Sequence, residues 1–246
     1  IDIYVYDGIW TNKFIPFWWS PATAFGDMAA QPVNYKNGEY ELVPPFNDPQ
    51  MIEFRGLGAR RMVDHEHEEP VTFGLFFKDL QTATFKYGGP ACDLAESLYR
   101  MGLLSEEPVQ VNGSSVVPLK LVCKLTPPAP SNTETIKEAL SEGMALEEGA
   151  TLIRVQGIKD DKAVCLDNYI NAPGLTESFE KYGISHESFL TGQSAFLFTK
   201  LFVNDMIATR GVFPPEVLQA QQRQYYLAEA AKLGITVDEI GATRLF

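Results

Sequence analysis

The chain has 246 residues and a mass of 27.4 kDa, which suits one large domain or two small ones. Hydrophobic residues make up 45% of it and charged residues 21%, which excludes disordered, collagen-like and coiled-coil proteins. The net charge of −12 repels phosphate backbones, so we expect no nucleic-acid partner. No apolar run reaches the roughly 18 residues that a membrane span needs, so we expect no membrane partner.

The cysteines and the first residues indicate where the protein works. There are three cysteines and none forms a CxxC pair, so neither a disulfide framework nor a zinc ribbon is supported. A reducing, cytoplasmic location fits this pattern best. The chain opens on the alternating residues Ile1 to Tyr6, without a Met or a signal peptide. We therefore expect a fragment of a longer protein.

The first third of the chain is expected to combine short strands with one helix. Asp7-Gly8 is a pair that ends strands. Ser20 followed by Pro21 is typical of a helix N-terminus, and Asn37-Gly38 is typical of a tight hairpin turn. In chain order these signals predict a strand over 1–6, a helix within 16–30, a hairpin over 33–43 and a strand over 51–58.

The middle of the chain mixes clear and ambiguous segments. Short apolar runs have no decisive period, so two of them, 71–77 and 116–125, fit a helix or a strand equally well. The clearer predictions are a strand over 82–87 that ends at Gly88-Gly89-Pro90, a helix over 93–104 and a linker over 126–132. The acidic segment over 134–148 is expected to be solvated and to contain a weak helix and a turn.

The last third adds a hairpin and two helices. Lys159-Asp160-Asp161 separates two alternating runs, which predicts a hairpin. The predicted elements are strands over 151–157 and 162–166, a helix over 187–207, and a helix from Pro214 to Leu233 inside a C-terminal helical segment over 214–246. Runs of strands and runs of helices predict an α+β fold with a mixed, largely antiparallel sheet covered by helices.

Residues 56–61, GLGARR, half-resemble a dinucleotide-binding fingerprint. Arg61 replaces the third glycine, and no capped helix follows to offer its amide groups to a pyrophosphate. A turn at the end of a strand is the better interpretation, so we expect that this chain alone binds no dinucleotide. The sequence contains no GxxxxGK[ST] phosphate loop and no GxSxG nucleophile elbow.

The densest polar cluster is DHEHEEP at residues 64–70. On a strand, His65 and His67 would share one face, and two such histidines bind zinc where a third ligand joins them. No other cluster supplies an obvious third ligand, and His186 lies far along the chain. We expect a polar pocket wall or a subunit contact here and assign no metal, although histidines beside carboxylates also transfer protons near neutral pH.

Trp10, Trp18 and Trp19 crowd one early segment. Such clusters usually belong to a core or an interface. An aromatic wall for an extended substrate is the alternative.

Three further segments follow a distinctive order. They are TFKYGG at 84–89 with a helix ending in LYRMGLL at 98–104, TLIRVQG at 151–157, and TG at 191–192 followed by RGVFPPE at 210–216. In this order and spacing they resemble the motifs of saccharopine dehydrogenase-like proteins over about residues 51–233. The last motif is the most specific of them.

The resemblance implies an oxidoreductase that uses NAD or NADP and forms or breaks a secondary amine between an amino acid or polyamine and a carbonyl partner. Saccharopine formation and carboxynorspermidine formation are two such reactions. In these proteins a Rossmann domain binds the nucleotide. A following α+β domain, of the glyceraldehyde-3-phosphate dehydrogenase-like C-terminal type, holds the substrate and pairs the subunits. The resemblance assigns residues 1–246 to that second domain, so NAD or NADP would be bound mainly by a domain outside this chain.

Two positions depart from the family motifs. Lys86 stands where the family has Arg, and it offers a point charge in place of two parallel bonds to a carboxylate. If this position contacts substrate, the substrate differs from saccharopine. Leu190 stands where the family has Thr, which removes a hydroxyl near a helix start.

The candidate site residues follow from the expected chemistry on an amino-acid-like small molecule. Reduction of an imine needs a hydride at carbon and a proton at nitrogen. The candidates for proton transfer or hydrogen bonding are His65, His67 and Tyr87, and those for substrate binding are Lys86, Arg154, Arg55 and Thr191. No cofactor-binding residue is assigned in this chain.

Lys86 and Tyr87 are predicted to lie at the mouth of the functional cleft. Neighbouring side chains on a strand point to opposite faces, so only one of the two reaches a given pocket. The amide groups of the next helix would favour an anion beside Lys86. The alternative is that Lys86 pairs with an acidic neighbour.

Two other functions stay open: a non-catalytic dimerisation or assembly module of the same fold, and a metal-dependent hydrolase built on His65 and His67. We expect a homodimer built on β-structure, because a sheet domain must pair or cover its edges.

Overall fold

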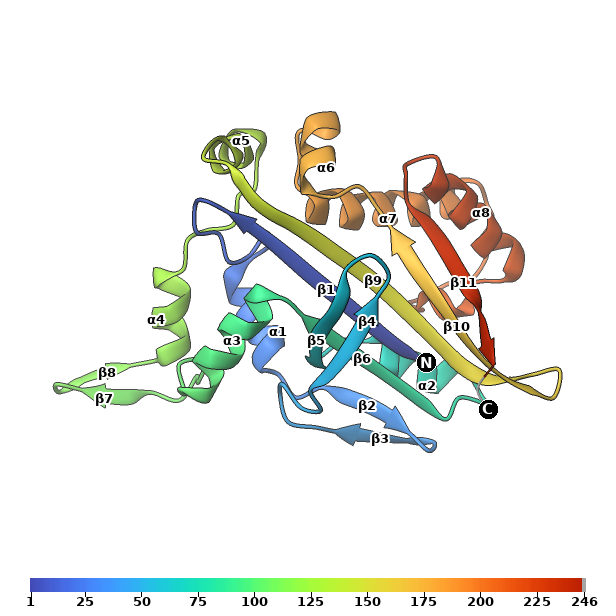
Figure 1. Ribbon diagram of the computed structural model, residues 1–246, viewed down its shortest axis with the longest axis horizontal. Coiled ribbons are helices and arrows are strands. Elements are labelled where there is room, and N and C mark those ends of the chain that lie inside the picture. The colour runs from blue at the N-terminus through green and yellow to red at the C-terminus, as the bar shows by residue number, and fades with distance from the viewer. Residues whose placement is uncertain (245–246) are drawn as a thin grey trace.

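A computed structural model describes residues 1–244, which form one large sheet with helices around it (Figure 1). The strands are β1 (Asp2–Thr11), β2 (Val33–Lys36), β3 (Glu39–Leu42), β4 (Gln50–Phe54), β5 (Gly58–Asp64), β6 (Thr82–Gly88), β7 (Val109–Val111), β8 (Ser114–Val116), β9 (Met144–Lys159), β10 (Lys162–Asn171) and β11 (Thr236–Arg244). The helices are α1 (Pro21–Ala29), α2 (Glu69–Phe76), α3 (Pro90–Arg100), α4 (Pro118–Leu125), α5 (Thr133–Ser141), α6 (Leu175–Tyr182), α7 (His186–Val203), the short η1 (Pro215–Val217) and α8 (Ala220–Ala231).

The main sheet has the order β11-β10-β9-β1-β6-β2-β3, and the β4–β5 hairpin joins it where β5 pairs with β6. Within the described residues, only β1 and β6 run parallel, and the other paired strands are antiparallel. Long β1 and β9 lie side by side along the diagonal of Figure 1. The expected α+β class with a mixed, largely antiparallel sheet is confirmed.

Alternate residues of the strands build two apolar layers. One layer includes Ile3, Phe85 and Tyr87 and packs against α1 and α3. The other includes Tyr4 and Leu152 and lies beneath the β4–β5 hairpin. A third, smaller cluster joins α5 and α6 to the segment before α1 through residues Ile15, Trp18, Ile136, Ala139 and Leu175. The sheet is therefore covered on both faces near β1, which places that strand at the centre of the molecule.

The expected break at Asp7-Gly8 is wrong. Strand β1 continues to Thr11 because Asp7 and Gly8 pair with Gly149 and Glu148 of β9. Strand β9 likewise begins at Met144, seven residues before the predicted start at Thr151, so part of the acidic segment expected to be solvated lies in the sheet. Pairing across the sheet overrides local signals of this kind.

The predicted hairpins at Asn37-Gly38 and Asp160-Asp161 are confirmed, and all four residues have the positive φ angles that tight hairpin turns require. The same Asn-Gly pair at residues 112–113, also with positive φ angles, joins β7 to β8. In Figure 1 that small hairpin projects at the left edge, away from the main sheet.

Several predicted boundaries shift. The strand over 51–58 ends at Phe54, because Arg55 to Leu57 form the turn into β5. The helix over 93–104 begins at Pro90 and ends at Arg100. Helix starts at Ser20 and near Glu187 are confirmed, and the two ambiguous segments form α2 and α4.

The C-terminal segment over 214–246 is not helical throughout, which corrects the prediction. Pro214-Pro215 opens only the single turn of η1, and the last helix begins at Ala220. The chain then returns as β11, which pairs with β10 at the edge of the sheet. Helix α6 was also not predicted. No described helix is long and apolar enough to cross a membrane.

Candidate functional site

Lys86 is buried, which corrects the prediction that it lies at the mouth of a cleft. Its side chain is 2% exposed, and its ammonium group lies 2.6 Å from Asp64 Oδ1 and 3.0 Å from Asp48 Oδ2. It also donates to the Asp48 carbonyl at 2.9 Å. The alternative stated from the sequence, pairing with an acidic neighbour, therefore describes Lys86.

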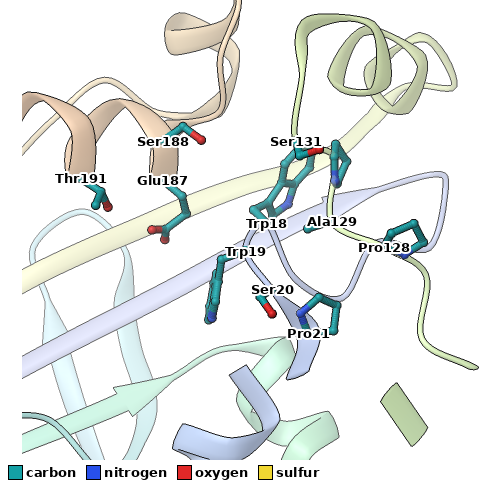
Figure 2. Close-up of a pocket in the computed structure, with 11 residues that line it drawn as sticks. Trp18, Trp19, Ser20, Pro21, Pro128, Ala129, Ser131, Glu187, Ser188 and Thr191 are labelled. Atoms are coloured by element: carbon teal, nitrogen blue, oxygen red, sulfur yellow. The ribbon is translucent and has the colours of Figure 1, made fainter. Parts of the chain in front are cut away.

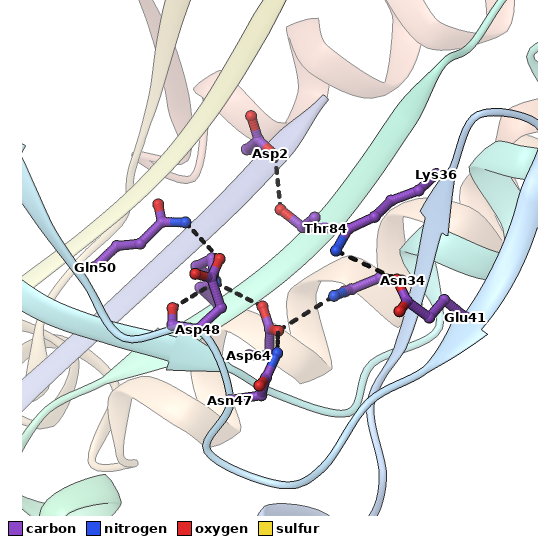
Figure 3. Close-up of polar contacts among 10 residues, drawn as sticks. Asp2, Asn34, Lys36, Glu41, Asn47, Asp48, Gln50, Asp64 and Thr84 are labelled. Carbon is purple, nitrogen blue, oxygen red and sulfur yellow. Dashed lines mark hydrogen bonds and ion pairs between the residues drawn. The ribbon is translucent and has the colours of Figure 1, made fainter.

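The Asp64 carboxylate is held from several sides. It accepts hydrogen bonds from Asn34 Nδ2 at 3.2 Å and Asn47 Nδ2 at 3.0 Å, and Figure 3 shows both amides directed at it. The Lys86 ammonium group also holds the pKa of Asp48 below its usual value. The Lys86 ammonium group thus has one acceptor for each of its three donors, so it has none left for a ligand, and we assign this ion pair a structural role.

The predicted arginine contacts are also engaged within the chain. Arg154 makes two parallel bonds to Asp167, at 2.7 and 2.8 Å, and stands over the Tyr4 ring. Arg55 pairs with Asp238 at 3.0 Å. Lys86, Arg154 and Arg55 thus lie in three separate ion pairs, and the structure does not bring them together around one carboxylate.

His65 and His67 do not share a strand face, because β5 ends at Asp64. His65 packs beside Tyr87, and burial lowers its pKa to about 4. His67 stacks on Phe85 and bonds to Glu69; burial lowers its pKa, but the nearby carboxylates raise it overall. Two described groups of side chains have metal-ligand spacing, and neither contains both histidines.

The GLGARR segment does not fit a dinucleotide. Gly56 lies in the β4–β5 turn and Gly58 begins β5, and both have positive φ. Arg60 and Arg61 follow on the strand and pair with Glu148 and Glu96. No helix N-terminus follows the glycines, so the amide groups that a pyrophosphate needs are missing at this position.

A cavity of about 520 Å³ lies where the N-terminal end of α7 meets two loops (Figure 2). Its aromatic wall comes from Trp18 and Trp19. Trp18 also belongs to the core, as expected for the early tryptophans, and Trp10 does not line this cavity. Glu187 and Thr191 project from α7 on the same side, and Thr191 is one of the predicted substrate-binding residues. The complete lining is Trp18, Trp19, Ser20, Pro21, Pro128, Ala129, Pro130, Ser131, Glu187, Ser188 and Thr191.

A partly buried polar cluster formed by Asp7, Tyr87, His186 and Glu187 adjoins this cavity through Glu187. Ligand atoms of Asp7, His186 and Glu187 all lie within 4.8 Å of one another. Burial, followed by repulsion from Glu187 and Glu147, raises the pKa of Asp7 to about 7. Burial also raises the pKa of Glu187. This cluster therefore contains carboxyl groups that gain and lose protons nearer neutral pH than ordinary carboxyl groups do.

Two further groups complete the cluster. Burial, together with the charges of Asp7 and Glu187, raises the pKa of Tyr87 well above its usual value. Burial lowers the pKa of His186 to about 4, so its imidazole is neutral. Both remain uncharged at neutral pH and act as hydrogen-bonding groups. Tyr87 is thus a predicted site residue that the structure places in the cluster.

Tight backbone packing holds Asp7 in place. A side chain at Gly89 would collide with the Asp7 backbone carbonyl, and Gly89 has a φ of +131°. The sequence suggested that a ligand or neighbouring backbone approaches these glycines, and it is the backbone of β1 that does so. Glu147, opposite Ile9, is occupied in capping α6 by accepting from the Leu175 and Thr176 amides.

Sequence reasoning missed Asp7, His186 and Glu187. The sequence predicted a strand break at Asp7 and only a helix start at Glu187. A carboxylate at an inward position of a central strand is a signal of function. That signal becomes visible only once Asp7 is known to lie inside the strand.

Comparisons with known proteins agree with this architecture. The model of the saccharopine dehydrogenase C-terminal domain matches residues 13–235. Among solved structures, apo histidine-tagged saccharopine dehydrogenase (L-Glu forming) from Saccharomyces cerevisiae is similar, with a TM-score of 0.56 and 14% sequence identity. The match covers 98% of this chain and 67% of that chain. A search of curated proteins finds no match.

Proposed function

Because the chain belongs to the saccharopine dehydrogenase C-terminal domain family, we propose that it is the substrate-holding domain of an NAD(P)-dependent oxidoreductase. The substrate would be a secondary amine, or the corresponding imine, built from an amino acid or a polyamine. The observation that carries this proposal is Glu187, which lines the open cavity and belongs to the partly buried polar cluster.

The cluster suits chemistry at an amine nitrogen. Interconversion of an amine and an imine requires a proton to be exchanged at nitrogen, and a carboxyl group with a raised pKa performs this step near neutral pH. Glu187 is placed to exchange that proton with a substrate in the cavity, while Asp7 stands behind it. Tyr87 is proposed as a hydrogen-bonding partner of Asp7, and Thr191 as a contact to the substrate.

The residues described here offer no place for a dinucleotide at the GLGARR segment, so we propose that another part of the protein binds it. Calorimetric titration of this chain with NADH and NADPH tests the point. We expect no binding at micromolar concentrations. Micromolar binding of either cofactor would show that the chain holds a nucleotide site of its own.

The function itself is tested by turnover of the protein that carries this chain. Oxidation of NADH or NADPH is followed with pairs of an amine and a carbonyl compound, the amines being amino acids and polyamines. We expect oxidation that needs both members of a pair, and a Glu187→Gln variant with a lower kcat/KM. Absence of turnover with every pair, together with no binding of any amine to the chain, would contradict the proposal.

We also propose a homodimer and a cytoplasmic location. The edge strand β3 is exposed along its whole length, and edges of this kind pair or are covered in stable proteins. Cys92, Cys123 and Cys165 are free thiols, which favours a reducing compartment. Light scattering should give twice 27.4 kDa, and a monomer at high concentration would contradict the dimer.

A further inference from the structure

Asp7, His186 and Glu187 come from distant parts of the chain and end side by side. Asp7 lies within β1, in a strand paired on both sides, and His186 and Glu187 are the first two residues of α7. One ligand atom from each residue lies within 4.8 Å of the ligand atoms of the other two, and His186 Nε2 lies 3.8 Å from Glu187 Oε1. An imidazole and two carboxylates are thus grouped around one point of the fold.

The two carboxyl groups have no cationic partner in the part of the chain that the structure describes. Neither Asp7 nor Glu187 pairs there with a lysine or an arginine. Burial raises the pKa of both groups, and repulsion from Glu187 and Glu147 raises that of Asp7 further. Buried carboxylates in proteins are paired with a cation or coordinate a metal ion. The first of these arrangements is not present here.

Two neutral neighbours have buried polar atoms without partners. Both ring nitrogens of His186 lack a hydrogen bond, and burial lowers the pKa of the imidazole to about 4, so the ring is neutral and has a lone pair to coordinate with. The hydroxyl of Tyr87, which is only 7% exposed, is also unpartnered. Tyr87 shares a sheet face with Asp7, because it lies opposite Val5 and Asp7 follows two residues later. Buried polar atoms are nearly always hydrogen-bonded, so these orphans indicate a missing ligand.

The types of donor atom favour a transition metal ion such as zinc. Mg²⁺ and Ca²⁺ prefer oxygen ligands alone, whereas Zn²⁺ combines imidazole nitrogen with carboxylate oxygen. Zinc bonds of about 2.0–2.2 Å set tetrahedral ligands roughly 3.4 Å apart. The 3.8 Å between His186 Nε2 and Glu187 Oε1 is close to that spacing, so small side-chain rotations would bring these two atoms to it.

An ion can reach this position from solvent. Glu187 lines the cavity and extends toward it from α7, and its side chain is 39% exposed (Figure 2). The net charge of −12 attracts cations to the protein. The cavity therefore supplies the entry path that a metal site needs.

We propose that Asp7, His186 and Glu187 form a binding site for Zn²⁺ or a similar divalent transition metal ion, with the Tyr87 hydroxyl donating to the Asp7 carboxylate. Carboxylates that bind metals are commonly held by such a second hydrogen bond. The inference goes beyond the proposed function and does not depend on it. A bound ion would occupy the Glu187 carboxylate, so Zn²⁺ would inhibit any turnover that uses this group to exchange a proton.

The experiment is calorimetric titration of the untagged chain with ZnCl₂, after dialysis against EDTA and then against buffer. We expect one ion to bind per chain, with a dissociation constant in the micromolar range or below. MgCl₂ is the control for general attraction of cations to an acidic protein, and it should not bind. Absence of Zn²⁺ binding, or equal affinity for Mg²⁺, would overturn the inference. Neither result affects the proposed function, because its turnover assay contains no added metal.

Variants locate the ion. His186→Leu and Glu187→Gln should each weaken Zn²⁺ binding by about tenfold or more, because each removes a ligand nitrogen or a ligand charge. His67→Leu is the matched control, since His67 belongs to the other described group with metal-ligand spacing, and it should not change the affinity. Asp7→Asn, checked for folding by circular dichroism, provides a further test if the α7 variants are unstable. Unchanged affinity in a folded variant of the cluster, or loss of binding in His67→Leu, would overturn the assignment.

Co²⁺ provides a spectroscopic check on the ligands. Thiolate ligands add an intense charge-transfer band in the near ultraviolet, and nitrogen and oxygen ligands do not. We expect the visible bands of bound Co²⁺ without the thiolate band. A thiolate band would place the ion on Cys92, Cys123 or Cys165 and overturn the assignment.

Discussion

The polar cluster around Lys86 and the partly buried polar cluster around Asp7 differ in how their charges are paired. Around Lys86, each charge has a partner: Asp64 and Asp48 bind the ammonium group, and two asparagines complete Asp64. Around Asp7, buried polar atoms of Tyr87 and His186 have none. The charges around Lys86 are paired and hold strands together, although Asn34 Oδ1 in that cluster is also without a partner; the carboxyl groups around Asp7 have raised pKa values and one of them, Glu187, lines a cavity.

Removal of the central charge of the cluster around Lys86 should cause a large loss of stability. Lys86→Met should lower the free energy of unfolding by about 3–5 kcal/mol, because it leaves two acidic groups without their buried partner. Urea denaturation measures the effect. Lys36→Met is the matched control, since Lys36 pairs with Glu41 at the surface, and it should cost less than about 1 kcal/mol. Equal effects of the two variants would show that the buried ion pairs of Lys86 contribute no more to stability than the surface pair of Lys36 does.

Removal of a charge from the cluster around Asp7 should instead raise the free energy of unfolding. Folding raises the pKa of Asp7 from 3.8 to about 7, so the free energy of unfolding falls as pH rises through this range. Asp7→Asn removes the buried charge and should stabilise the protein by about 2–4 kcal/mol at pH 8, and by less at pH 5. Denaturation at both pH values measures this.

Asp167→Asn serves as the reference for that experiment. The bond to Arg154 lowers the pKa of Asp167, so its contribution is present above its unfolded pKa and the variant should lose stability at pH 8. A destabilising effect of Asp7→Asn at pH 8 would show that the Asp7 carboxylate has a partner in the folded protein.

The smallest expected change in stability comes from His186. His186→Leu conserves volume and removes two buried polar atoms that have no partner, so the free energy of unfolding at pH 7 should change by no more than about 1 kcal/mol. A loss of stability as large as that of Lys86→Met would place His186 among the structural residues.

Much of the architecture was predictable because its signals are local. Ser20 with Pro21, and the turn residues at 37–38 and 160–161, act within a few residues of themselves, so the first helix and two hairpins were predicted. Composition and motif order supported the α+β class and the family. The end of the helix at Arg100 and the strand β11 were missed, because their boundaries depend on packing and pairing with distant segments.

The site was predictable only in part, for the same reason. Tyr87 and Thr191 were named from motifs, and they lie in or beside the cavity. The sequence by itself determined that Lys86 and Tyr87 face opposite sides of a strand, because side chains alternate along β-structure. Only the tertiary structure decided that Lys86 finds ion-pair partners on its side of the strand, whereas the Tyr87 hydroxyl has no hydrogen bond on the other. The parallel pairing of β1 with β6 and the approach of α7 bring Asp7, Tyr87 and Glu187 together across long chain separations, and burial there changes their pKa values.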